Sequence, residues 1–199
     1  MKDLFISNSL NIIKKKNPNY SEEKMEEIEY GLVGLYLTIS KTIIIVLIAL
    51  LLGMIKELII FTIIYNIIRM PSFGLHAKSS MACLISSTIM FLGIPYLCTL
   101  IQIPLLIKII LGIVGVILIA KNSPADTEKR PIVNSKRRKI YKIISTVLAV
   151  LFVIMSVIIK DNFLANCFII SLILQSLITA PTVYKIFKMP YNNYKNYNV

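Results

Sequence analysis

Long apolar runs dominate the chain and lie close to one another. Three of them cover residues 42–55, 58–68 and 109–120, separated by only a few polar residues or by one further apolar segment. A soluble helical bundle would need polar stripes along its helices, and most of these runs have none. The pattern therefore predicts an all-α, polytopic membrane protein.

The apolar pattern divides into a short N-terminal helix and about six membrane spans. In residues 2–16, Ile6, Leu10 and Ile13 share one helical face and three lysines follow, as in an amphipathic helix at a membrane interface. A second helix begins after Ser21, a good N-cap residue, and runs as a cytosolic extension into the first span. The expected spans cover about residues 36–55, 58–70, 79–99, 104–120, 141–159 and 163–180.

Helix-breaking residues separate some of these spans. Pro71 is expected to end the second span, because a proline disfavours helical geometry in the residue before it. With Gly74 it predicts a re-entrant or broken segment near 71–78, and Pro95 predicts a kinked or shortened third span. We expect one integral membrane domain over 1–199, made of an interfacial helix (1–20), a membrane helix bundle (21–180) with a basic cytoplasmic loop (121–140), and a mobile cytoplasmic tail (181–199).

The charge distribution orients the spans. The net charge is +12, and all but four of the 22 Lys and Arg residues fall in segments on one side of the six-span layout. Positively charged segments remain in the cytoplasm, so both termini and the 69–83 stretch are expected there. Because this rule accounts for the positive charge, we do not expect a nucleic acid partner.

The candidate chemistry lies in the 69–83 stretch. The only histidine, His76, precedes Cys83 by seven residues, and a thiol with an imidazole can form a nucleophile and its base. On one straight helix the two would be separated by about 10.5 Å along the axis, at about 1.5 Å per residue, which is too far for a hydrogen bond. A dyad therefore requires that 71–78 not be regular helix. The other cysteines, Cys98 and Cys167, also lie in apolar segments, and three cysteines do not form a disulfide framework.

A helix that begins near Ser79 would favour this chemistry. Its N-terminus favours the thiolate form of Cys83, and its free N–H groups can stabilise an oxyanion. The group that orients His76 stays open among Asn66, Ser79, Ser80 and a backbone carbonyl. One histidine and one cysteine lack the other ligands of a tetrahedral site, so we expect neither a metal nor a cofactor.

Noncatalytic alternatives stay open on these residues. An interfacial histidine and a membrane cysteine are common structural residues. A small membrane transporter or exporter of a peptide would need polar side chains that face one another at mid-membrane. The candidates for that role are Lys41, Gln102, Lys108 and Gln175. A noncatalytic membrane partner, such as a regulatory subunit, is the other alternative.

Two motifs carry a family resemblance over most of the chain. The first is Arg69-x4-Gly74-x-His76-Ala77-x5-Cys83, and the second is Pro124-Ala125-Asp126-x4-Pro131 in the basic loop. Together, in this membrane context, they resemble the accessory gene regulator B (AgrB) family. Its members are bacterial cell membrane endopeptidases that process the precursor of a cyclic autoinducing peptide.

The resemblance implies a cysteine endopeptidase, with roles for particular residues. Cys83 would be the nucleophile and His76 the general base. Supporting or substrate-binding positions would be Arg69, Gly74, Lys129 and Arg130. Many members have a second glycine where this chain has Phe73, which implies a less flexible segment and would allow the ring to contact substrate.

The implied reaction has two steps. Cys83 cleaves an AgrD-like precursor peptide and releases its acidic C-terminal segment, and the acyl-enzyme thioester is then attacked by a Cys or Ser side chain of the precursor. A thiolactone or lactone results. The basic loop would attract the acidic segment, although topology control explains its charge equally well. Family members are also expected to form homodimers.

Overall fold

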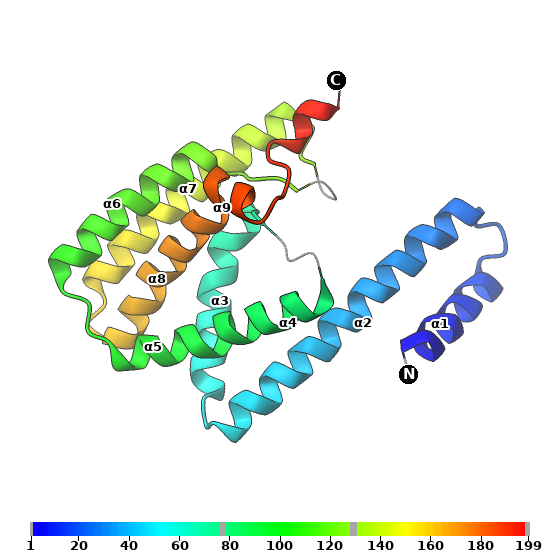
Figure 1. Cartoon of the computed structure of the whole chain (residues 1–199), viewed down its shortest axis with the longest axis horizontal. Coiled ribbons are helices and arrows are strands. Elements are labelled where there is room, and N and C mark those ends of the chain that lie inside the picture. Colours follow the sequence, from blue (N-terminus) through cyan, green and yellow to red (C-terminus); the bar gives the residue numbers. More distant parts are fainter. Residues whose placement is uncertain (1, 76–78, 128–130, 198–199) are drawn as a thin grey trace. The chain divides into compact units, whose positions relative to one another are not determined.

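The chain folds into helices in the computed structural model, which describes residues 2–75, 79–127 and 131–197 (Figure 1). Within these ranges the regular elements are all helical, and Phe73 and Ala125 form an isolated β-bridge. The predicted all-α class is confirmed. Contacts divide the chain into two compact units, Met1–Gly53 and Met54–Val199.

The first unit is a pair of helices. Helix α1 (Lys2–Lys16) has the predicted bounds, and α2 (Glu22–Leu51) begins at the predicted cap, where the Ser21 side chain accepts a hydrogen bond from the amide of Lys24. The two helices pack against each other, with the rings of Phe5 and Tyr36 5.6 Å apart. At least part of the apolar face of α1 therefore packs against α2.

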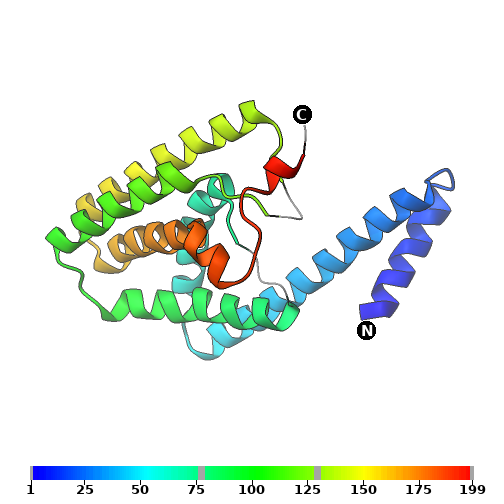
Figure 2. The same ribbon diagram turned by 45° about the horizontal axis from the view of Figure 1, so that its top comes forward.

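The second unit contains the remaining helices. They are α3 (Ile55–Ser72), α4 (Ser80–Thr88), the π-helix η1 (Ile89–Gly93), α5 (Ile94–Leu100), α6 (Leu105–Asn122), α7 (Ser135–Ile158), α8 (Asn162–Ile178), α9 (Pro181–Ile186) and the 3-10 helix η2 (Asn193–Asn196). Helices α6, α7 and α8 lie side by side, and α3 packs against α7 and α8 (Figures 1 and 2). Glycines allow close approach here, since a Cβ at Gly115 would lie 2.8 Å from the side chain of Leu172.

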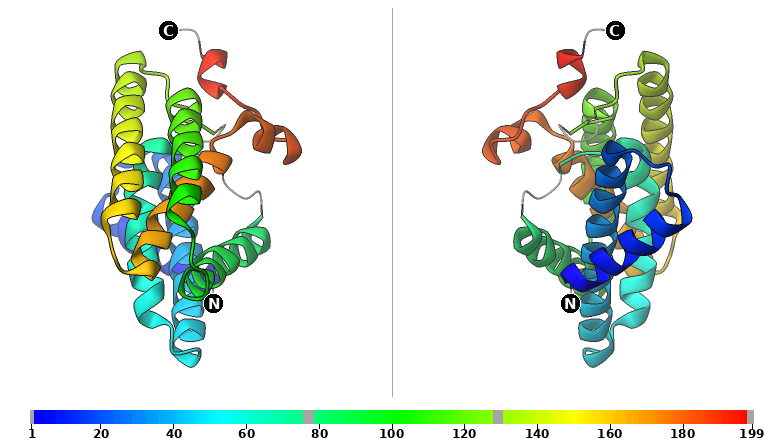
Figure 3. Two further views of the ribbon diagram at one scale, coloured as in Figure 1. Left: turned by 90° about the vertical axis from the view of Figure 1, so that its left-hand side faces the viewer. Right: turned by 90° about the vertical axis from the view of Figure 1, so that its right-hand side faces the viewer.

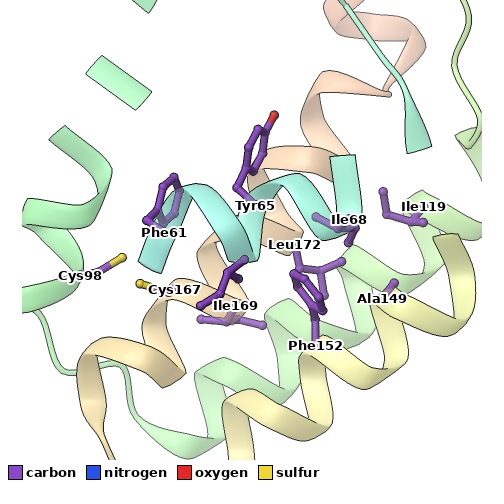
Figure 4. Close-up of a cluster of buried hydrophobic side chains, with 11 residues drawn as sticks. Phe61, Tyr65, Ile68, Cys98, Ile119, Ala149, Phe152, Cys167, Ile169 and Leu172 are labelled. Atoms are coloured by element: carbon purple, nitrogen blue, oxygen red, sulfur yellow. The ribbon is translucent and has the colours of Figure 1, made fainter. Parts of the chain in front are cut away.

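Buried apolar side chains from α3, α5, α6, α7 and α8 form one core (Figure 4). Phe61, Ile68 and Leu172 are fully buried in it. Cys98 of α5 and Cys167 of α8 are also fully buried there, and Figure 4 shows their sulfur atoms turned toward each other. These two cysteines are core residues.

A π-helical turn accommodates Pro95. Helices α4, η1 and α5 form one continuous helical segment from Ser80 to Leu100 (Figure 2). The amide of Ile94 donates to the carbonyl of Ile89, five residues earlier. A proline ring collides with the carbonyl four residues before it in a regular helix, and the wider turn relieves that collision. The third predicted helix is therefore neither stopped nor shortened at Pro95.

Two predicted helix boundaries are wrong, and the tail contains short helices. Helix α3 continues through Pro71 to Ser72, because a proline in the last turn costs only one backbone hydrogen bond while Phe73 N still donates to Arg69 O at 3.0 Å. Helix α7 begins within the predicted basic loop, where the Asn134 side chain caps it by accepting from Arg137 N at 3.1 Å. The described part of the tail contains the short helices α9 and η2, and Asn193 N donates to the Asp126 side chain.

In the part of the chain that the structure describes, four helical segments are long and apolar enough to cross a membrane. They are Glu22–Leu51, Met81–Leu100, Leu105–Asn122 and Ser135–Ile158, and α8 is a shorter apolar helix. Helix α3 has 18 residues but carries Lys56, Glu57 and Arg69. The chain is therefore a membrane-type helical protein, and the six-span layout stays a prediction.

Several of the segments that the charge distribution places in the cytoplasm meet in the second unit. The C-terminal ends of α3, α6 and α8, the beginning of α7 and the tail all lie at one end of the bundle (Figures 1 and 3). Hydrogen bonds join them, including Gly74 N to Ala125 O and Asn193 N to the Asp126 side chain. Arg69 and Gly74 of the first motif and Ala125 and Asp126 of the second are therefore at this end.

Candidate functional site

The backbone turns sharply after α3. Phe73 has φ 56° and ψ −140°, and Gly74 has φ 116°. Glycine adopts positive φ at little cost, whereas Phe73 is strained there. The ring of Phe73 packs edge-on against Tyr141 of α7, with centroids 5.2 Å apart, and this contact offsets part of the strain. The predicted break between α3 and α4 is confirmed at residues 73–75, which we call the clamp turn.

Arg69 holds the carbonyl groups of the clamp turn. Its Nη1 donates to Phe73 O at 2.6 Å, and its Nη2 donates to Leu75 O at 2.8 Å and Gly74 O at 3.4 Å. The guanidinium group suits this role because its donors have a fixed fork geometry. Arg69 forms no ion pair in the described part of the chain. It therefore acts on the backbone of its own chain, four to six residues away.

Helix α8 holds the same turn from the other side. Gln175, which is fully buried, donates from Nε2 to Phe73 O at 2.6 Å. Leu75 N donates to Ile178 O at 3.4 Å. Phe73 O thus accepts from both Arg69 and Gln175. The Gln175 amide has a structural partner, which weakens its assignment to a transport pathway.

The second motif pairs with the first through the backbone. Gly74 N donates to Ala125 O at 2.7 Å, and Ala125 N donates to Ser72 O at 3.0 Å, which forms the parallel bridge between Phe73 and Ala125. Residues 124–126 therefore lie directly against the clamp turn although they are about 50 residues further along the chain. The side chain of Asp126 is turned away into a buried set of donors in the tail.

Cys83 lies at the start of the next helix. Ser79 caps α4 by accepting from Ala82 N at 3.1 Å, and Cys83 N donates to Ser79 O at 3.0 Å. The Cys83 sulfur lies 4.0 Å from the hydroxyl of Ser87, one turn further on. Unlike Cys98 and Cys167, which are fully buried, Cys83 is partly exposed. It is the accessible thiol of the three.

The structure joins some of the predicted site residues and not others. Arg69 and Gly74 come together in the clamp turn, whereas the hydrogen bonds of Cys83 in the described chain stay within α4. His76, Lys129 and Arg130 lie outside the described residues. Where the structure describes the chain, no three His, Cys, Asp or Glu side chains gather as metal ligands would.

Two contributors to this region were not recognised in the sequence. Gln175 was a transport candidate, and its isolation within an apolar helix was the available signal. The tail residues around Asn193 were assigned to a mobile segment, and their polar composition gave no sign of burial. Both contacts span more than 60 residues of sequence.

Comparison with known proteins settles the family. A family model described as Accessory gene regulator B matches residues 6–179. The chain belongs to the accessory gene regulator B family. The Accessory gene regulator protein B of Staphylococcus carnosus is 35% identical over 151 residues, which cover 76% of this chain and 78% of the relative. An AgrB-like protein of Clostridium acetobutylicum is 31% identical over 176 residues, 86% of this chain and 84% of that protein.

Further relatives extend the match along the chain. An AgrB-like protein of Listeria monocytogenes is 28% identical over 188 residues, which cover 94% of this chain and 91% of that protein. No solved structure matches the chain. Accessory gene regulator B proteins belong to quorum-sensing systems and are associated with the processing of a precursor peptide at the membrane. The clamp turn therefore lies in a member of a peptide-processing family.

Loss of the Arg69 fork is expected to loosen the clamp turn. Arg69→Lys keeps the charge but cannot donate to three carbonyl groups from one planar group, so we expect a loss of about 2–3 kcal/mol in the free energy of unfolding. Hydrogen exchange at residues 73–75 should rise accordingly. The control is Lys56→Arg, an exposed basic residue at the other end of α3, which should change neither quantity. Unchanged exchange in Arg69→Lys would contradict the clamp.

Proposed function

We propose that the chain is a membrane cysteine endopeptidase that cleaves the C-terminal part of an autoinducing-peptide precursor. Cys83 is the nucleophile and His76 its general base, and the acyl-enzyme thioester on Cys83 permits cyclisation to a thiolactone or lactone. The observation that carries this proposal is the contrast among the cysteines. Cys83 is partly exposed near the start of α4, whereas Cys98 and Cys167 are buried in the core.

The first chemical step forms a thioester. His76 accepts the thiol proton as the Cys83 sulfur attacks the scissile carbonyl carbon, and then gives the proton to the leaving amine as the peptide bond breaks. The first amides of a helix have no intrahelical acceptor. With Ala82 N occupied by the Ser79 cap, we assign the amides of Ser80 and Met81 to the oxyanion.

The second step closes the ring. A thiol or hydroxyl of the precursor attacks the thioester carbonyl, its proton passes through His76, and Cys83 leaves as the thiol. Transfer from thioester to thiol needs little free energy, so the cyclic product depends on keeping water away from the thioester. The position of Cys83 at the start of the apolar Met81–Leu100 segment supports such exclusion.

The clamp turn supplies the fixed point for the general base. Leu75, the residue immediately before His76, is held through its carbonyl by Arg69 and through its amide by Ile178. A general base must lie within hydrogen-bond reach of the group it deprotonates, so its backbone attachment matters. In this proposal Arg69 and Gly74 support the base and do not touch the substrate.

Basic side chains near the site suit an acidic leaving segment. Lys136, Arg137 and Lys139 are exposed on the first turns of α7, which begins three residues after the buried Ile132. With Lys129 and Arg130 they would attract the negatively charged part of the precursor and raise its local concentration. This attraction should weaken as salt is added.

A thioester-trapping experiment tests the proposal. The purified full-length protein in liposomes is mixed with a precursor that has a central cysteine and an acidic C-terminal segment. The same precursor with that cysteine changed to alanine has no internal acceptor, so the acyl-enzyme should accumulate. We expect an adduct on the peptide that contains Cys83, and neutral hydroxylamine should remove it.

The competing function gives a different result in the same system. Intact precursor that accumulates on the other side of the liposome membrane, without any cleavage or adduct, would support a transporter and overturn the protease. An adduct on Cys98 or Cys167 in place of Cys83 would overturn the assignment of the nucleophile.

A further inference from the structure

The carboxylate of Asp126 is buried among donors from three parts of the chain. Only 1% of the residue is exposed. Its Oδ1 accepts from Asn193 N at 3.0 Å, and its Oδ2 accepts from Tyr194 N at 2.9 Å and, more weakly, from Ile132 N at 3.4 Å. Arg138 Nη1 lies 3.7 Å from the same Oδ2. Both carboxylate oxygens therefore accept hydrogen bonds from the described part of the chain.

The tail adds further contacts around the second motif. Tyr184, 1% exposed, donates from its hydroxyl to Asp126 O at 3.1 Å and Ala125 O at 3.3 Å. Burial raises the pKa of Tyr184, so its hydroxyl stays protonated and remains a donor. The Arg138 guanidinium carbon lies 3.2 Å from the ring centre of Tyr194, which fits a cation–π contact. The tail thus bonds to the backbone of residues 125–126 through Tyr184 and to the Asp126 side chain through Asn193 and Tyr194.

The same carboxylate closes the base of the basic loop. Ile132 N and the backbone of Asp126 are the two ends of the segment that contains Lys129 and Arg130. Because Oδ2 of Asp126 bonds to Ile132 N, one side chain fixes both ends of that segment. The ion pair of Arg138 with the same oxygen connects this segment to the first turns of α7.

Asp126 is adjacent in sequence to the residue that pairs with the clamp turn. Ala125 N and O bond to Ser72 and Gly74, and Asp126 is the next residue along the chain. A change at Asp126 that releases the tail therefore acts on the backbone that pairs with the clamp turn. Removing one partner of a buried, charge-assisted hydrogen bond costs much free energy, because the other partner is left buried and unpaired.

We propose that Asp126 is a positioning residue of the processing site, which holds the tail, the base of the basic loop and the clamp turn in one arrangement. This inference rests on the proposed function for its effect on catalysis, but its structural part is independent. The tail therefore contributes to the arrangement of the site, although it follows the last predicted span.

The test compares Asp126→Asn with the wild type. The amide has one acceptor oxygen and presents an NH2 group to a backbone donor, so it loses at least one amide partner and the charge that faces Arg138. We expect hydrogen exchange in peptides covering 188–197 and 72–75 to rise about tenfold, and precursor cleavage to slow by about tenfold. A truncated chain that ends at Phe187 should show the same rise at 72–75.

Asp161→Asn is the matched control. Asp161 caps α8 by accepting from Leu164 N at 2.8 Å, and asparagine caps a helix equally well, so exchange and cleavage should stay at wild-type levels. Faster exchange in the tail without a change at 72–75, in both Asp126→Asn and the truncated chain, would overturn the proposal. Normal cleavage by Asp126→Asn with a loosened clamp turn would also overturn it. If Asp126→Asn changes hydrogen exchange as expected but the wild type never cleaves the precursor, the structural role of Asp126 is supported and the proposed function is overturned.

Discussion

Cys83→Ala is expected to abolish precursor cleavage, with a loss of at least about 10³-fold in rate. The alanine side chain has no nucleophile, and no acyl-enzyme can form. Cys83 is partly exposed, and among the described residues its sulfur has one polar contact, at 4.0 Å from the Ser87 hydroxyl, so the substitution should leave the fold intact. Cleavage and cyclisation are both followed by mass spectrometry after co-expression with the precursor.

The other two cysteines provide the control. Cys98→Ala and Cys167→Ala remove fully buried sulfur atoms from the core, so each should lower the free energy of unfolding by about 1–2 kcal/mol while cleavage continues. The double variant keeps Cys83 as its single thiol, and a thiol reagent should then label that residue alone. Cleavage by Cys83→Ala at the wild-type rate, or its loss only in the core variants, would contradict the assignment. His76→Ala should reduce the cleavage rate about as much as Cys83→Ala does, while the thiol reagent should still label Cys83.

Local sequence signals predicted most of the helices. Helix α1 has the expected bounds because its apolar period and terminal lysines are both local features. Ser21 and Ser79 likewise cap the helices that follow them. The wrong helix boundaries lie where another local interaction outweighs the residue preference on which the prediction relied. Pro71 lies in the last turn of α3, where it removes only one backbone hydrogen bond. The Asn134 side chain caps α7 within a segment that its polar composition predicts to be a loop.

The candidate site was predicted only in part, because its contacts are distant in sequence. The motifs identified Arg69 and Gly74, but the partners of the clamp turn include Ala125, Gln175 and Ile178, which lie up to 103 residues away in sequence. Composition gives no information on such pairs. Asp126 shows the same limit, since its position in a motif was visible while its partners in the tail were not. The geometry of His76 with Cys83 stays a prediction.

Phe73 shows how the structure can explain a departure from the family pattern. A phenylalanine at φ 56° and ψ −140° occupies backbone space that suits glycine, the residue found there in many relatives by the resemblance. Arg69, Gln175 and the Tyr141 ring hold it in place. The ring therefore has a partner within the chain, and its expected contact with substrate is not needed to account for it.

Gly74→Ala is expected to have the second-largest effect, because the clamp turn has no room for a side chain. An added Cβ would lie 2.7 Å from Arg69 Nη1 and 2.9 Å from Ile178 Cγ2, at a φ of 116° that L side chains rarely adopt. Either Arg69 leaves its carbonyl acceptors or the backbone moves. We expect a loss of about 2–4 kcal/mol in the free energy of unfolding and at least about a hundredfold loss in cleavage rate.

Two other glycines separate the effect of the positive φ from the effect of the collision. Gly34 lies within α2 with no atom within 4 Å of its added Cβ, so Gly34→Ala should stabilise the chain by about 0.5–1 kcal/mol. Gly53 has φ 68° and similarly open space, so Gly53→Ala tests positive φ without a collision. If both controls cleave the precursor normally and Gly74→Ala does not, the collision with the Arg69 clamp is the cause. Wild-type cleavage by Gly74→Ala would mean that the clamp turn can rearrange without loss of function, and the support it gives to His76 would then have to come from elsewhere in the chain.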